Sequence, residues 1–259
     1  CTDALACNFD PAAAVDNGSC TYAADNQDCN GNPLPPEGYW IQAEPVAEHA
    51  GIIGDTDLSG HTTYNLMLHT PSPEVFVSAM GGDVDNPFEL NSTASPAWFN
   101  DAAFGENLGS EINPALFSFL PQVQFDSWFT IGASSESDGY SLSTAIGDIN
   151  PFSAFNANEN ILVDDSIGFA IFTTYPGGVD FTNPAFAGDD HAVLLGQITT
   201  AGTLSGFIYL QLFPDGTQSS DIRHRFPILN SNPNGEPGCT DFVACNYDAS
   251  ASDEDGSCS

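Results

Sequence analysis

Carboxylate side chains at short spacing are the residues of this chain best suited to chemistry. They cluster near both ends and lie close to Asn-Gly or Asp-Gly turns, so their oxygens suit a hard cation such as Ca²⁺. The alternative is that Asp residues simply favour turn geometry and solvation. The calcium-ligand candidates near the ends are Asp3, Asp10, Asp16, Asp241, Asp248, Asp253 and Asp255.

A further calcium candidate lies at Asp55 and Asp57, which open a D-x-D-x-S-G segment. This segment matches the first half of an EF-hand loop, but the glutamate expected at the twelfth position is absent. The same alternative of a plain Asp-rich turn applies here.

Cysteine is the second residue type with chemistry to offer, and six of the seven follow a C-x5-C-x12-C spacing that occurs twice. Disulfides are the expected use, because no His and no CxxC pair accompanies them to favour zinc. The first triplet plus Cys29 makes an even set, whereas the second triplet leaves one cysteine over, which predicts a partner beyond residue 259 or an intermolecular disulfide. The candidate disulfide cysteines are Cys1, Cys7, Cys20, Cys29, Cys239, Cys245 and Cys258.

These cysteines belong to an internal repeat, since residues 1–20 and 239–258 are identical at 11 of 20 aligned positions. Segments rich in Pro, Gly and Asn at 30–38 and 229–238 separate the repeats from the middle of the chain. We therefore expect a cysteine-rich repeat with its linker at 1–36, a central domain at 37–230, and a linker with a second repeat at 231–259.

The central domain is predicted to be all-β, a β-sandwich or jelly roll flanked by the small disulfide-rich repeats. Apolar residues alternate with polar ones around Leu66, Phe169 and Leu210, and turn signals such as YPGG and PDGT separate the segments. Further strands are expected at 75–80, 127–132, 192–199 and 222–228, and a short helical turn at 113–120.

The charge excludes several classes of partner. Asp and Glu total 35 against two arginines, and the net charge is -33. Nucleic acid and anionic membranes need basic clusters, and no apolar run is long enough to span a bilayer. Such self-repulsion favours a saline, calcium-rich environment, because the Debye length is only about 8 Å at physiological ionic strength.

Other residues with chemical potential carry weaker signals. Arg223 and Arg225 are two apart, so on a strand they share a face, either to pair with local carboxylates or to dock an acidic neighbouring subunit. Core packing is the expectation for Trp98, with stacking on sugars from a predicted loop as the alternative, and Trp128 is assigned to the core. Sequons make Asn17 and Asn91 candidate glycosylation sites.

No catalytic motif is present: the five histidines lack metal-site spacing, and there is no GxSxG or phosphate loop. We therefore expect a protein that is not an enzyme. A glycosidase-like pair of carboxylates stays an alternative, because such pairs form in space rather than along the sequence.

Two parts of the chain resemble known sequences. The motif C-T-D-x-x-A-C-N-[FY]-D followed by D-x-G-S-C resembles a cysteine-rich repeat of very large secreted proteins of marine microbes, carried here by 1–20 and 239–258. Segments such as INPALFSFLPQVQFDSWFTIG resemble a β domain of no established activity that accompanies those repeats. The resemblance implies location and architecture rather than chemistry.

The sequence therefore predicts an extracellular, secreted or cell-surface structural module of a repetitive or filament-forming protein, with disulfide- and calcium-braced spacers. Its expected partners are copies of itself or neighbouring modules. An adhesin or carbohydrate-binding module that recognises glycans is the alternative, and a glycosidase ranks third.

Overall fold

The computed structural model describes residues 1–3, 6–10, 12–16, 18–24, 27, 34–230, 236–238 and 251–254. The chain divides into two compact units, Cys1–Glu37 and Gly38–Ser259, so the first boundary lies one residue from the predicted one. Each unit is described by itself. The side chains of 236–238 and 251–254, and the remaining residues, lie outside the description.

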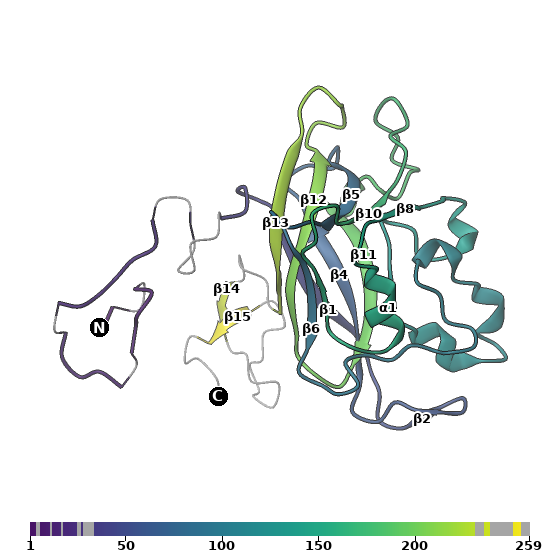
Figure 1. Ribbon diagram of the computed structural model, residues 1–259, viewed down its shortest axis with the longest axis horizontal. Helices are drawn as coiled ribbons and strands as arrows, with labels where there is room; N and C mark the ends of the chain where they lie inside the picture. The colour runs from purple at the N-terminus through teal and green to yellow at the C-terminus, as the bar shows by residue number, and fades with distance from the viewer. Residues whose placement is uncertain are drawn as a thin grey trace. The chain divides into compact units, whose positions relative to one another are not determined.

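The second unit consists mainly of β-strands, which confirms the all-β prediction (Figure 1). The strands are β1 (Trp40–Glu48), β2 (Ile52–Ile53), β3 (Thr56–Asp57), β4 (Thr62–His69), β5 (Phe76–Gly82), β6 (Phe88–Ser92), β7 (Trp128–Phe129), β8 (Ser143–Ile146), β9 (Ile161–Val163), β10 (Phe169–Phe172), β11 (Ala192–Thr200), β12 (Leu204–Phe213), β13 (Ile222–Leu229), β14 (Glu236–Gly238) and β15 (Ala251–Glu254).

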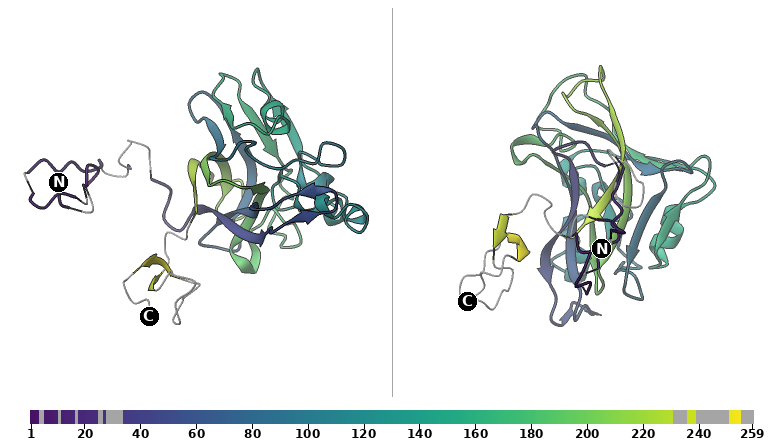
Figure 2. Two further views of the ribbon diagram at one scale, coloured as in Figure 1. Left: turned by 90° about the horizontal axis from the view of Figure 1, so that it is seen from below. Right: turned by 90° about the vertical axis from the view of Figure 1, so that its left-hand side faces the viewer.

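Eleven of these strands form one sheet, in the order β7-β11-β4-β1-β13-β12-β5-β10-β8, with β6 joining β12 and β9 joining β6. The pairs are antiparallel except β1 with β13, which run parallel with Ile41 opposite Ile228. The sheet curls around its core, as the two views of Figure 2 show. Phe129 on β7 thereby reaches Phe88 on β6, with ring centroids 5.8 Å apart.

One continuous core fills the curl, and it follows from the period-two pattern of the strands. On β12 the inward residues Ile208, Leu210 and Leu212 are fully buried, and Ile41 and Leu66 meet them from the other half of the sheet. Each such side chain stabilises the fold by about 1.5–3 kcal/mol relative to leaving it in water.

Short helical segments lie outside the sheet. The α-helix α1 (Pro151–Asn156) begins where Asn150 accepts a hydrogen bond from the Phe152 N–H, with Pro151 at its first position. The 3-10 helices are η1 (Gly109–Glu111), η2 (Pro114–Leu116), η3 (Pro121–Phe125), η4 (Glu136–Asp138) and η5 (Gly188–Asp190). In the described part of the chain, every helix is too short or too polar to cross a membrane.

Candidate functional site

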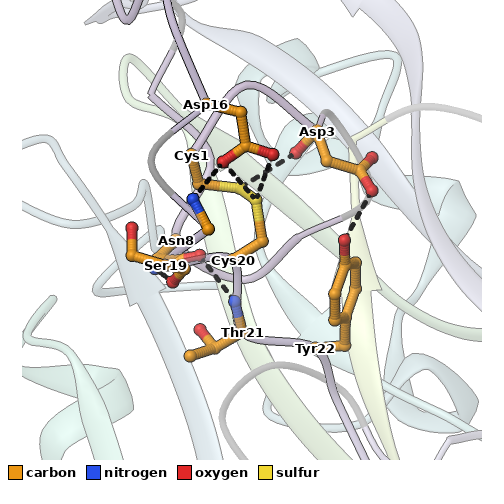
Figure 3. Close-up of a disulfide and its surroundings, with 9 residues drawn as sticks. Cys1, Asp3, Asn8, Asp16, Ser19, Cys20, Thr21 and Tyr22 are labelled. Carbon is orange, nitrogen blue, oxygen red and sulfur yellow. Dashed lines mark hydrogen bonds between the residues drawn. A yellow bond between two sulfur atoms is a disulfide. The ribbon is translucent and has the colours of Figure 1, made fainter.

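The first unit is held by a disulfide between Cys1 and Cys20, whose Cα atoms are 4.9 Å apart (Figure 3). Disulfide bracing is thus confirmed for these two cysteines, and Cys7 is disulfide-bonded as well. The other predicted cysteines, namely Cys29, Cys239, Cys245 and Cys258, lie outside the described residues.

Backbone and side-chain hydrogen bonds tie the segment that follows Cys20 to the start of the unit. Asn8 bridges two segments: its amide donates to the Ser19 carbonyl at 2.6 Å, and its Oδ1 accepts from the Thr21 N–H at 2.9 Å (Figure 3). The Cys7 N–H donates to the Thr21 carbonyl at 2.8 Å. Asn8 therefore holds the segment after Cys20 against the start of the unit.

Three carboxylates in the described part of this unit make local contacts. Asp10 and Asp16 close turns by accepting the N–H groups of Ala12 and Gly18, both at 2.9 Å, and Asp3 accepts from the Tyr22 hydroxyl at 2.7 Å. Tyr22 is exposed, and its hydrogen bond to Asp3 raises its pKa.

Calcium binding by the acidic clusters stays a prediction. Three of the calcium candidates lie outside the described residues, namely Asp241, Asp248 and Asp255, and Asp253 is on β15. The glycosylation candidate Asn17 also lies outside them. Nowhere in the described part of the chain do three His, Cys, Asp or Glu side chains gather closely enough to share a metal ion.

Asp55 lies in the turn of the β2–β3 hairpin, and Asp57 is the last residue of β3. Asp57 accepts from both the N–H and the hydroxyl of Ser59, at 3.0 and 2.5 Å, and these bonds lower its pKa. Asp55 accepts from the Thr56 hydroxyl at 3.1 Å. The D-x-D-x-S-G segment thus forms a turn that is stabilised by its own side chains.

The two arginines share the outer face of β13 as predicted, but their surroundings differ. Arg225 donates to the Pro87 carbonyl at 2.6 Å, pairs with Glu89, and lies 3.8 Å from the centroid of the Phe207 ring. Arg223 is 59% exposed and is paired with Asp221 at 2.6 Å. Local pairing therefore accounts for Arg225, whereas Arg223 keeps an accessible guanidinium.

Beside Arg223 lies a groove of about 290 Å³ on the outer face of the sheet, which sequence reasoning missed. The strand register builds it from two rows that cross β8, β10, β5, β12 and β13. One row places Ala145, Ala170 and Gly81 beside Tyr209, and the other places Ala79 beside Gln211 and Arg223. Small residues thus form the floor, and Tyr209, Gln211 and Arg223 form a polar wall.

The groove combines an apolar floor with hydrogen-bonding and cationic groups. Burial raises the pKa of Tyr209, and the Arg223 guanidinium opposes that shift, so the phenol stays a neutral donor at neutral pH. Ile167, 68% exposed, adds apolar surface at the rim. A ligand with both apolar faces and hydroxyl groups would fit this lining.

Trp98 packs in the core, which confirms the expectation favoured for it and excludes the sugar-stacking alternative. Its side chain is 1% exposed, its Nε1 donates to the Phe155 carbonyl at 2.9 Å, and its ring packs against Phe155. The loop that carries it folds back over α1 and buries it. Trp128 is core, as predicted. Asn91 lies half-buried on β6 opposite Ser205.

Comparisons with known proteins give no family. No family model matches the chain, and no curated protein matches it. A solved structure of the collagen binding subdomain of the Enterococcus faecalis surface protein ACE matches 76% of this chain and 99% of its own, at 9% identity and a TM-score of 0.25. A likeness this low carries no argument about function.

Proposed function

We propose that this chain is an extracellular structural module of a repetitive surface or filament-forming assembly, in which cysteine-rich repeats join the β domain to copies of itself or to neighbouring modules. The Cys1–Cys20 disulfide carries the proposal. In the described part of Cys1–Glu37, Ala6 alone is a buried hydrophobic residue, so this unit depends on cross-links rather than on a core. Disulfides of this kind persist in oxidising extracellular compartments.

The odd cysteine count supports covalent assembly, because seven cysteines cannot all pair within residues 1–259. Thiol blocking followed by intact-mass measurement and non-reducing electrophoresis tests this. We expect disulfide-linked multimers that reduction converts to monomer. A purely monomeric protein that retains one reduced thiol would contradict the proposal.

Calcium bracing of the repeats belongs to the same proposal. Limited proteolysis within residues 1–37 should accelerate in EDTA at constant ionic strength, because a bound cation would stabilise the repeat and screen its carboxylates. Equal cleavage rates with and without Ca²⁺ would rule it out.

The groove on the outer face favours a second candidate function, an adhesin that binds glycans. Tyr209 and Arg223 offer an aromatic face and a cation on a surface that is otherwise strongly acidic. A glycan array probed with the whole chain should give hits that Tyr209→Ala and Arg223→Gln each remove. Phe119→Ala is the control, since Phe119 is 82% exposed and does not line the groove.

A further inference from the structure

A second cavity, of about 350 Å³, lies among three segments that are far apart in the sequence. It is formed by the loop at 100–107, by the residues that join η3 to β7, and by the C-terminal end of α1. Ala102, Glu106 and Asn156 are exposed, so the cavity opens to solvent. Its polar lining includes the carboxylates of Asp101, Glu106 and Asp126 and the amides of Asn100, Asn107 and Asn158.

Three amide oxygens in this lining are buried and accept no hydrogen bond: the Oδ1 atoms of Asn100, Asn107 and Asn158. The orientation of Asn100 is fixed, because its Nδ2 donates to the Phe155 carbonyl at 2.7 Å and leaves the oxygen as the free atom. A buried acceptor without a partner costs about 1–3 kcal/mol. Three in one cavity therefore indicate that the cavity holds water or a ligand that satisfies them.

Asp126 contributes a buried carboxylate to the same lining, and its side chain is 1% exposed. The loop at 100–107 wraps it: Oδ1 accepts the Asp101 N–H at 2.7 Å and Oδ2 accepts the Glu106 N–H at 3.0 Å. At Gly105 even a Cβ would lie 2.6 Å from Oδ1, so the loop follows the carboxylate closely.

This carboxylate has no positive partner in the described lining. No Lys, Arg or His lines the cavity, and the two arginines pair with Asp221 and Glu89 elsewhere. An unpaired buried charge is costly, so it either takes up a proton or holds a cation. Burial accordingly raises the pKa of Asp126 to about 7, against the lowering effect of the backbone N–H groups of Asp101, Glu106 and Ser127.

We propose that this cavity is a binding site for a hard divalent cation of the calcium type, with Asp126 and the amide oxygens of Asn100, Asn107 and Asn158 as ligands. Carboxylate and amide oxygens in a flexible set are the ligands that Ca²⁺ prefers, and Asp101 and Glu106 add negative charge around it. The site lies in the central domain and does not depend on the function proposed above or on calcium in the terminal repeats.

A catalytic pair of carboxyl groups is the competing use of this cavity, since Asp126 has a raised pKa and Asp101 is its neighbour. Both oxygens of Asp126 are already engaged by backbone N–H groups. The three amide oxygens can only donate lone pairs, which serves a cation and does nothing for proton transfer. The lining therefore favours cation binding.

The test titrates the whole chain, freed of metal with EDTA, with CaCl₂ or MgCl₂ at constant ionic strength while heat of binding and melting temperature are recorded. Asn107→Ala removes one amide oxygen that has no hydrogen bond to lose, so in EDTA it should melt like the wild type. In Ca²⁺ we expect it to weaken binding at this site by about tenfold or more. Asp126→Asn should abolish binding at this site.

Asp189→Asn is the matched control, because it removes the same charge from an exposed residue away from the cavity. It should bind Ca²⁺ like the wild type. Equal stoichiometry, affinity and Ca²⁺-induced melting shift in the wild type, Asn107→Ala and Asp126→Asn would overturn the proposal and leave a water-filled cavity. A shift of the same size in MgCl₂ would overturn the assignment to calcium.

Discussion

At the scale of single residues, the two arginines show how one side-chain type is put to two uses. Arg225 has a side chain that is 19% exposed, and it satisfies a backbone carbonyl, a carboxylate and an aromatic face. Arg223 contacts Asp221 in the open. Exposed ion pairs add little to stability, whereas breaking a partly buried, hydrogen-bonded pair leaves its partners unsatisfied.

Replacement of each arginine by glutamine should therefore have unequal effects. We expect Arg225→Gln to lower the free energy of unfolding by about 1–3 kcal/mol, because Glu89 and the Pro87 carbonyl lose a donor. Arg223→Gln should cost less than about 0.5 kcal/mol. Urea denaturation of both variants measures the difference, and equal losses would contradict it.

Asp126 predicts a pH dependence of the metal-free protein. Its pKa is raised to about 7, so between its unfolded value near 4 and this value the folded state binds more protons than the unfolded state. Stability from this group is full below about pH 4 and is lost as the pH rises to about 7, with a total of up to a few kcal/mol.

Melting curves in EDTA between pH 5 and 8 measure this loss. The other carboxylates also repel one another more as the pH rises, so the difference between the wild type and Asp126→Asn isolates the contribution of Asp126. A difference that does not change with pH would show that Asp126 is ionised throughout. Saturating Ca²⁺ should flatten the curve, because the cation competes with the proton.

At the scale of elements, Asp165 fastens the turn before β10 to the segment after β8. Its Oδ1 accepts the N–H groups of Ile167 and Gly168, and its Oδ2 accepts that of Ile149, all between 2.8 and 3.0 Å. These bonds lower the pKa of Asp165, and the bond from the Gly168 N–H has the largest effect. The same turn forms part of the rim of the groove on the outer face.

Asp165→Ala should lower the melting temperature and release the β8 edge of the sheet, since three backbone donors lose their acceptor. Asp164→Ala is the control, because it removes the same charge from an exposed neighbouring residue. Hydrogen exchange at Ile149, Ile167 and Gly168 should accelerate in the first variant alone. Unchanged exchange there would show that the carboxylate does not hold this edge.

Strands in which apolar and polar residues alternate regularly were predictable from the sequence, whereas the groove on the outer face and the Asp126 cavity were not. The expected strands at 192–199 and 222–228 match β11 and β13, and the helical turn expected at 113–120 contains η2. β1 was missed because Pro45 and its acidic residues obscure the alternation of Ile41 and Ala43, although Pro45 sits at a register shift. The groove and the Asp126 cavity depend on strand register and on loops that meet only in space.

Some signals of these features were present in the sequence. Asn150-Pro151 is a helix-start pattern that could have predicted α1. The Asn residues at 156, 158 and 160 indicate a polar loop but do not indicate Asp126 as its neighbour. Core packing was the favoured expectation for Trp98, but its predicted loop between Pro96 and Asn100 left an exposed alternative that only tertiary packing decides.

At the scale of the whole molecule, the negative charge belongs to the whole chain, whereas the cysteines lie only near its two ends. The net charge is -33, and all seven cysteines lie outside residues 37–230. We expect the main melting transition to rise with NaCl in the presence of EDTA, because salt screens the repulsion among carboxylates. A transition that is independent of ionic strength would show that the carboxylates are already neutralised by bound ions or protons.

Reduction of the disulfides should affect residues 1–37 and the β domain differently. Dithiothreitol should make residues 1–37 sensitive to protease and leave the far-ultraviolet circular dichroism of the β domain unchanged, because its core contains no cysteine. Loss of the β signal on reduction would show that the domain depends on the cross-linked unit.

The parallel pairing of β1 with β13 has a mechanical consequence. Ile41 at the start of the domain lies opposite Ile228 at its end, so the polypeptide enters and leaves at one place. Tension applied through the two ends of the domain would pull these parallel strands in opposite directions along their length, so it would load the pair in shear and its hydrogen bonds would resist together. If the domain then unravelled, its 190 or so residues would extend by roughly 600 Å, so optical-tweezer traces of the single domain should show one long extension step after this pair breaks.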